Sequence, residues 1–149
     1  MELLNITSQK IEDEIRERGA CATNTQGASM RPLLRANDAV FLTELKGDIK
    51  KYDVVLYRGT DKYILHRVIG FKGGHLVIRG DNTYRKEYVP RERVIACMVS
   101  FTRKGKRHRV DEFGYKFYSR FWNFIYPLRW LLHKFRSMIR KITKKQRCV

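Results

Sequence analysis

The sequence has few cysteines, no long apolar run and little negative charge, and each of these absences argues against particular classes of protein. Its three cysteines, Cys21, Cys97 and Cys148, are odd in number and show no C-x-x-C spacing. This argues against a disulfide framework or a zinc site and favours a reducing compartment. Residues 1–19 carry acids where a signal peptide would carry a basic segment and an apolar run. No window reaches the roughly 18 uncharged apolar residues of a membrane span. We therefore expect a cytoplasmic protein without a transmembrane helix, metal or cofactor.

The charge that is present is strongly positive and unevenly distributed. The 149 residues include 32 lysines and arginines against 15 acids, a formal net charge of +17. Residues 103–147 hold 15 of the basic residues and only 2 of the acids. A surplus of this size implies an anionic partner, either nucleic acid or an anionic membrane surface. Composition thus divides the single domain into an N-terminal helix (1–19), a nearly balanced body (20–110) and a basic aromatic tail (111–149).

The body is predicted to be β throughout. Five runs rich in β-branched and aromatic residues, separated by glycine- and aspartate-containing turns, predict strands at 39–45, 52–58, 63–70, 75–80 and 93–102. With no helical pattern between them, they favour a compact, coiled, partly closed antiparallel sheet. Before the body, Ile11 and Ile15 lie four apart in a short amphipathic helix over 8–18, with Gly19 as its stop.

The tail has the pattern of an amphipathic helix. Proline at 127 should kink or split it near Tyr126. Tryptophans beside a basic face are typical of a helix at a membrane interface, which favours a peripheral membrane location. The alternatives are packing of the stripe on the sheet or in a coiled coil, with nucleic acid less favoured. The apolar stripe is Phe117, Phe121, Phe124, Leu128, Leu131, Phe135, Met138 and Ile142. The candidate membrane or anion contacts are Arg120, Trp122, Trp130, Arg136 and Arg140.

Ser29, in the stretch TQGASMRPLL, is a candidate nucleophile. A catalytic serine needs an exposed hydroxyl on a constrained turn, close to a base and to backbone N–H groups. The small residues before Ser29 let a substrate backbone approach, and the methionine and proline after it offer an apolar wall and a stiff exit. The alternative is an ordinary turn between strands. The residues predicted to form the substrate and oxyanion loop are Gly27, Ala28, Met30 and Pro32.

His66 and Asp81 are the candidate partners of that serine. In the predicted strand, alternation places Ile64, His66 and Val68 on one face. These apolar neighbours predict a neutral imidazole that can act as general base, although a core histidine bonded to backbone is the alternative. Asp81, in a Gly-Asp-Asn turn, either orients that histidine or serves the turn alone.

The order of these blocks resembles the signal peptidase I family and its relatives, the LexA-type self-cleaving proteins. The resemblance covers residues 27–99 and is carried by GASMRPLL, YDVVLYR, YILHRVIGFKGG, VIRGDN and VPRERVIACMV. It implies a compact, coiled all-β fold with Ser29 as nucleophile. His66 stands where bacterial members use a lysine base, and HRVIG is similar to the endoplasmic-reticulum type, which uses histidine supported by the aspartate that Asp81 matches. Gly27 replaces a serine that often assists the oxyanion hole in bacterial members.

The expected function is therefore a serine endopeptidase acting on a leader or signal-like peptide or pre-protein. Two alternatives stay open. The first is a non-catalytic module whose tail binds membrane or nucleic acid. The second is self-processing, as in the LexA-type relatives, because Ala20, Cys21 and Ala22 form a small-x-small pattern just before Ser29. The favoured interpretation of these three residues is instead the edge of a strand.

Overall fold

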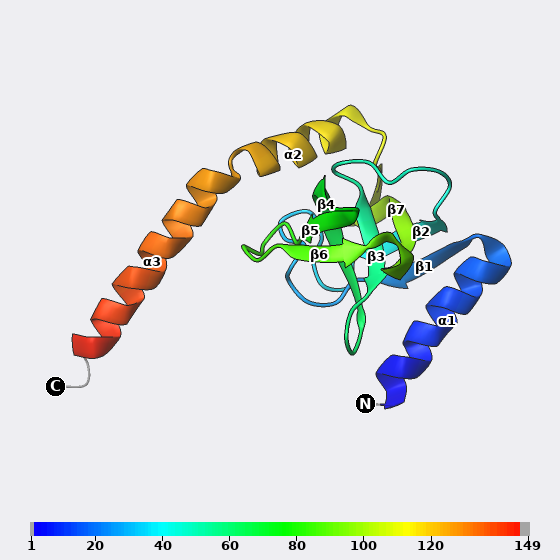
Figure 1. Ribbon diagram of the computed structural model, residues 1–149, viewed down its shortest axis with the longest axis horizontal. Coiled ribbons are helices and arrows are strands. Elements are labelled where there is room, and N and C mark those ends of the chain that lie inside the picture. Colours follow the sequence, from blue (N-terminus) through cyan, green and yellow to red (C-terminus); the bar gives the residue numbers. More distant parts are fainter. Residues whose placement is uncertain (1, 147–149) are drawn as a thin grey trace.

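The computed structural model describes the backbone of residues 2–146 and the side chains of residues 10–141. It consists of a β body with a helix at each end of the chain, and the C-terminal helix projects away from the body (Figure 1). The helices are α1 (Glu2–Arg18), the short 3-10 helix η1 (Arg91–Arg93), α2 (Phe113–Phe124) and α3 (Tyr126–Gln146). The strands are β1 (Ala20–Asn24), β2 (Ala39–Glu44), β3 (Val54–Arg58), β4 (Tyr63–Lys72), β5 (His75–Arg79), β6 (Glu87–Pro90), β7 (Val94–Arg103) and β8 (Lys106–Arg109).

The described strands form one open antiparallel sheet, which confirms the mainly β prediction. Their order is β1-β2-β7-β3-β4-β5-β6, with β8 paired to β7. The long strand β7 pairs with β2 along one edge, over residues 96–102, and with β3 and then β8 along its other edge, over residues 94–97 and 100–103. The five predicted strands correspond to β2, β3, β4, β5 and β7.

The sequence predicts only the edge of a strand at residues 20–22, within β1, and it predicts neither β6 nor β8, because the residues of these strands have weak intrinsic preference for strands. β1 is ACATN, β6 ends in proline, and β8 is the basic run KRHR. Each is held by pairing to a stronger neighbour. Pairing partners of this kind override local propensity.

Two apolar clusters make up the core. One contains Ile15, Met30 and Leu42 and so joins α1 and the Ser29 loop to the sheet. The other contains Tyr57, Val68 and residues of β5 and β6. The predicted stop of α1 is confirmed. Gly19 has a φ of +70°, which glycine adopts without strain, and its N–H donates to the Ile15 carbonyl at 2.8 Å.

The tail divides where the proline predicts. α2 ends at Phe124 and α3 begins at Tyr126, with Ile125 between them. Pro127 stands in the first turn of α3, where its missing N–H costs no helical hydrogen bond. Within the part of the chain that the structure describes, no helix is long and apolar enough to cross a membrane.

A charged contact fastens α1 to the β3–β4 hairpin. Glu12 accepts a hydrogen bond from Arg58 Nε at 2.6 Å and another from the Tyr63 hydroxyl. The hydrogen bond from Arg58 is the main reason that the pKa of Glu12 lies below its usual value.

Replacing Glu12→Ala should loosen α1 while leaving the sheet intact. Because Arg58 is half-exposed, we expect a loss of only about 1 kcal/mol, seen as faster amide exchange confined to α1. The matched control is Asp13→Ala, since Asp13 is exposed and should not change exchange. Equal protection of α1 in both variants would contradict this account of how the helix is held.

Candidate active site

Ser29 and His66 line the same cavity, which has a volume of about 540 Å³. The loop before and after Ser29 forms one wall, and the first residues of β4 up to His66 form another. Ile11 of α1 and the end of β1 close the remaining sides. Of the predicted loop residues, Gly27 and Met30 border this cavity. Ala28 and Pro32 are instead held through their carbonyl groups, by Asn82 and Arg103 respectively.

The Gly-Asp-Asn turn forms the support behind Ser29. The Asn82 N–H donates to the Ser29 carbonyl at 2.7 Å, and the Asn82 side-chain amide donates to the Ala28 carbonyl at 3.2 Å. A β-carbon placed on Gly80 would lie 2.6 Å from the Ser29 carbonyl oxygen and 2.9 Å from His66 Nε2. Glycine is therefore required at position 80, because the Ser29 backbone and the imidazole both approach it closely.

The other ring nitrogen of His66 is held by a tyrosine and a glutamate. His66 Nδ1 lies 3.3 Å from the Tyr57 hydroxyl, which donates its proton to Glu87 Oε2 at 2.6 Å. Glu87 Oε1 is itself 3.6 Å from Nδ1. Since the hydroxyl proton goes to Glu87, the hydroxyl oxygen accepts from Nδ1–H. This hydrogen-bond network assigns the proton to Nδ1 and leaves the Nε2 lone pair available.

The burial of His66 favours its neutral form, as the sequence predicts. Only 6% of the residue is exposed, and Nε2 is buried with no hydrogen-bond partner among the described residues. Burial lowers the pKa of His66 below 6.5, while the charges of Glu87 and Asp81 oppose that shift. A buried, unpaired acceptor is costly for stability, so it calls for a physical explanation.

Two further groups in the cavity region belong to Ser29: its side-chain hydroxyl and its backbone N–H. No described residue hydrogen-bonds its hydroxyl, so the Ser29–His66 bond of a working dyad is not formed here. Catalytic hydrogen bonds are often long or absent until substrate binds. Within residues 2–146 no carbonyl accepts from the Ser29 N–H either. That amide is therefore available to stabilise an oxyanion.

Asp81 does not contact His66, contrary to the role expected of it. Its carboxylate accepts two hydrogen bonds from Arg67, each 2.8 Å long, and one of 2.9 Å from the Tyr118 hydroxyl. Arg67 is fully buried, and 2% of the Asp81 side chain is exposed. A buried guanidinium requires a paired, hydrogen-bonded carboxylate. Asp81 meets this requirement and acts on His66 only through its charge.

Sequence reasoning missed Tyr57, Glu87 and Arg67. Alternation in β3 puts Tyr57 on one face with Val55, which pairs with His66, so a diagonal contact between Tyr57 and His66 was accessible once the register was known. Glu87 comes from β6, which carries no recognisable strand pattern. Arg67 reads as an ordinary exposed arginine because its counter-charge lies 14 residues away.

In the tail, one predicted membrane contact is turned toward the body. Trp122 faces the body: its indole N–H donates to the Asp81 carbonyl at 2.9 Å, and the Arg129 guanidinium lies over its ring. It is turned inward because it lies on the same side of α2 as Tyr118, which binds Asp81. Arg120, Trp130, Arg136 and Arg140 are exposed. The predicted stripe residue Ile142 lies outside the described side chains.

The predicted self-processing segment lies within β1. Ala20, Cys21 and Ala22 pair with Thr43, Leu42 and Phe41 of β2, and Cys21 is buried. A peptide bond held in a paired strand must leave the sheet before a protease can reach it.

Neither a protein-family model nor a curated protein matches this sequence.

Neutralising Asp81 should strongly destabilise the fold, because it leaves a fully buried arginine unpaired. For Asp81→Asn we expect a loss of about 3–5 kcal/mol, measured by urea unfolding followed by circular dichroism. The control is Asp111→Asn. Asp111 makes the same paired contact with Arg109, at 2.9 and 2.8 Å, but on the surface. Its urea midpoint should stay at the wild-type value, and equal effects of the two substitutions would refute the burial argument.

Proposed function

We propose that the protein is a serine endopeptidase of the signal peptidase and LexA-type kind, with Ser29 as nucleophile and His66 as general base. One observation carries the proposal. His66 Nε2 is buried and has no hydrogen-bond partner among the described residues, and it lies against Gly80 beside the Ser29 backbone, in a cavity that Ser29 also lines. Most buried polar side-chain atoms in proteins have a hydrogen-bond partner, and a catalytic role is one explanation for an exception.

The proposed reaction proceeds in two stages. Ser29 Oγ attacks the scissile carbonyl carbon while His66 Nε2 takes its proton. The Ser29 N–H stabilises the resulting oxyanion, and no side-chain donor is expected from position 27, which is glycine. The intermediate collapses as His66 returns the proton to the departing amine. Water then hydrolyses the acyl-enzyme, with His66 again acting as base.

Tyr57 and Glu87 take the orienting role in this proposal. The imidazolium that forms carries its Nδ1–H toward the Tyr57 oxygen, whose own proton is donated to Glu87. The negative charge of Glu87 stabilises the imidazolium, which is the contribution that an aspartate makes in a Ser-His-Asp set.

The cavity suits an extended peptide. β1 is an edge strand of the sheet, and its end, residues 23–24, borders the cavity together with Thr25. An edge strand offers unpaired backbone groups to an incoming strand. Apolar side chains of Met30, Leu34 and Val40 form part of the lining. We propose a leader or signal-like segment as substrate, on the basis of the resemblance of residues 27–99 to that family.

Peptidase activity should depend on Ser29 and His66. The test is incubation of the protein with a peptide library containing small residues, with cleavage read by mass spectrometry. Wild type should cleave, and both Ser29→Ala and His66→Ala should lower the rate by about 10³-fold or more, since a dyad fails when either member is removed.

The controls for this experiment are two other residues of the same types. Ser137→Ala, on α3, and His75→Ala, on an exposed hairpin, should cleave at the wild-type rate. Cleavage that survives in both dyad variants would refute the mechanism. Absence of cleavage in the wild type would favour the non-catalytic alternative.

The pH dependence should identify the base and its carboxylate. Because the base must be neutral, kcat/KM should rise with pH and level off above a pKa lower than 6.5, the direction in which burial moves His66. Glu87→Gln removes a charge that raises this pKa, so the inflection should move to still lower pH and the plateau should fall. The control Glu92→Gln, on the exposed helix η1, should leave the profile unchanged. A rise near the pKa of lysine would refute the assignment.

A further inference from the structure

The two sides of α2 meet different surroundings. Tyr115, Tyr118 and Trp122 face the body and bind Arg67 and Asp81. On the opposite side four phenylalanines at helical spacing are left in solvent: Phe113, Phe117, Phe121 and Phe124 are exposed by 85%, 59%, 48% and 81%. The alternative that the apolar stripe packs on the sheet is therefore wrong for α2. The aromatic residues of α2 that carry a polar group pack against the body, and the purely apolar phenylalanines are exposed to solvent.

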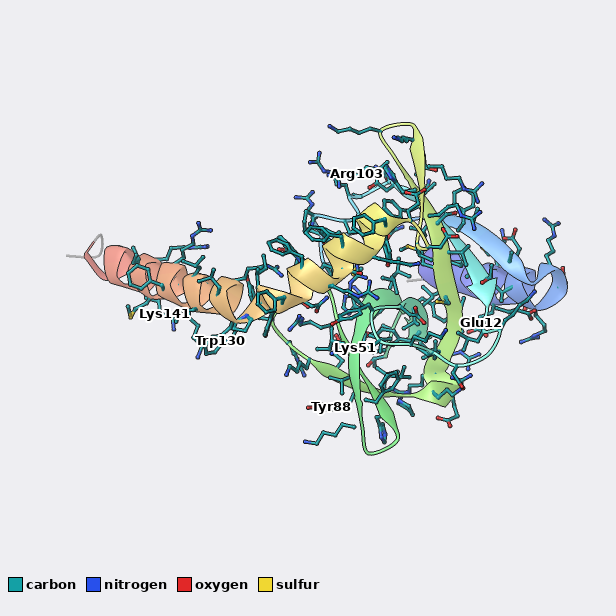
Figure 2. The ribbon with its side chains drawn as sticks, turned by 90° about the horizontal axis from the view of Figure 1, so that it is seen from above. Glu12, Lys51, Tyr88, Arg103, Trp130 and Lys141 are labelled. Atoms are coloured by element: carbon teal, nitrogen blue, oxygen red, sulfur yellow. The ribbon has the colours of Figure 1, made fainter. Side chains whose placement is uncertain are left out.

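The exposed stripe continues along α3 across the break at Ile125. Within α3 its members are again three or four residues apart, so they lie on one side of that helix. Beyond His133, whose ring stacks on Tyr84, no other described element lies beside α3, and Lys141 lies on this projecting part (Figure 2). The exposed stripe residues of α3 are Leu128 (59%), Leu131 (59%), Phe135 (56%) and Met138 (52%).

The charge beside this stripe has a single sign. Residues 113–146 contain nine lysines and arginines and neither aspartate nor glutamate. Arg120, Lys134 and Arg136 are exposed, and the Lys134 ammonium lies over the exposed Trp130 ring at 4.4 Å from its centroid. An indole with a cation beside it suits the boundary between lipid headgroups and acyl chains.

We infer that α2 and α3 bind the surface of an anionic lipid bilayer, with the phenylalanine and leucine stripe inserted among the acyl chains and the basic side chains at the phosphates. Exposed apolar side chains that follow one another along two helices and are rimmed by basic residues mark an interaction site. A basic rim is complementary to anionic headgroups. A second copy is disfavoured because two such rims repel each other. Nucleic acid needs the positive charge but not the stripe.

Body and bilayer are then connected through one helix. α2 is fixed to the Asp81 turn on one side and offers its phenylalanines on the other. Arg129, at the start of α3, also donates to the Asp81 carbonyl, at 2.7 Å. Lipid binding therefore holds the body, and with it the cavity, in a defined orientation to the surface. The inference does not depend on the peptidase proposal and is tested in Ser29→Ala protein.

The experiment is flotation of the full chain with vesicles of phosphatidylcholine alone or mixed in equal parts with phosphatidylglycerol. Phe117→Gln/Phe121→Gln should lower the partition coefficient on the mixed vesicles by about 10-fold or more, since both rings leave the acyl region. Lys134→Gln/Arg136→Gln should lower it by a similar factor, and added salt should weaken wild-type binding.

The matched control is Phe71→Gln, which removes an equally exposed phenylalanine (57%) from β4 and should leave binding unchanged. Circular dichroism confirms that each variant is folded. Three results would overturn the inference. The phenylalanine variant could bind like the wild type, binding could be equal on neutral vesicles, or the same variant could lose only self-association or binding to a DNA duplex.

Discussion

The ion pair between Arg67 and Asp81 is the interaction on which the other parts of the molecule depend. Both groups are withdrawn from water, so neither is tolerable without the other. The pair joins β4 to the turn after β5, and α2 covers it with Tyr115 and Tyr118. That same turn also holds the Ser29 loop, because the Asn82 N–H donates a hydrogen bond to the Ser29 carbonyl. The sheet, the Ser29 loop and the tail therefore meet at one buried pair of charges.

In the proposed mechanism, the two carboxylates near His66 share the roles that a single aspartate has in a Ser-His-Asp set. Asp81 satisfies a buried cation and shapes the Gly-Asp-Asn turn, whose glycine admits the imidazole and whose asparagine holds the loop. Glu87 faces the histidine directly and through Tyr57. Placing the second carboxylate on β6 frees Asp81 to be fully occupied by Arg67. In the proposed mechanism this arrangement keeps the orientation of the base independent of the main structural ion pair.

Local pattern predicted what local physics determines. Strands with β-branched runs, the stop at Gly19, the split at Pro127 and the apolar setting that lowers the pKa of His66 all follow from short stretches of sequence. The contacts that the sequence did not predict depend on strand register and on residues far apart in the chain. β6 forms only because β5 offers it an edge, so Glu87 could not be assigned to His66. The partner of Asp81 could not be chosen between a histidine and an arginine adjacent in β4. The inward orientation of Trp122 was not predicted, because an amphipathic pattern treats all aromatic rings as apolar. The side of α2 that faces the body in fact carries the rings that have a hydrogen-bonding group.

The inward side of α2 also bears on what counts as the unit of folding. In composition the chain changes character near residue 110, and the tail looks like an appendage that could be exchanged or removed. In space the first turns of that tail cap a charge in the interior of the β body. A chain without α2 would lose the tyrosines that cover the ion pair, and it would therefore need an uncharged residue in place of Arg67. Substitutions in the body at position 67 or 81 and substitutions on the inward side of α2 are therefore expected to depend on each other, although only the body borders the cavity.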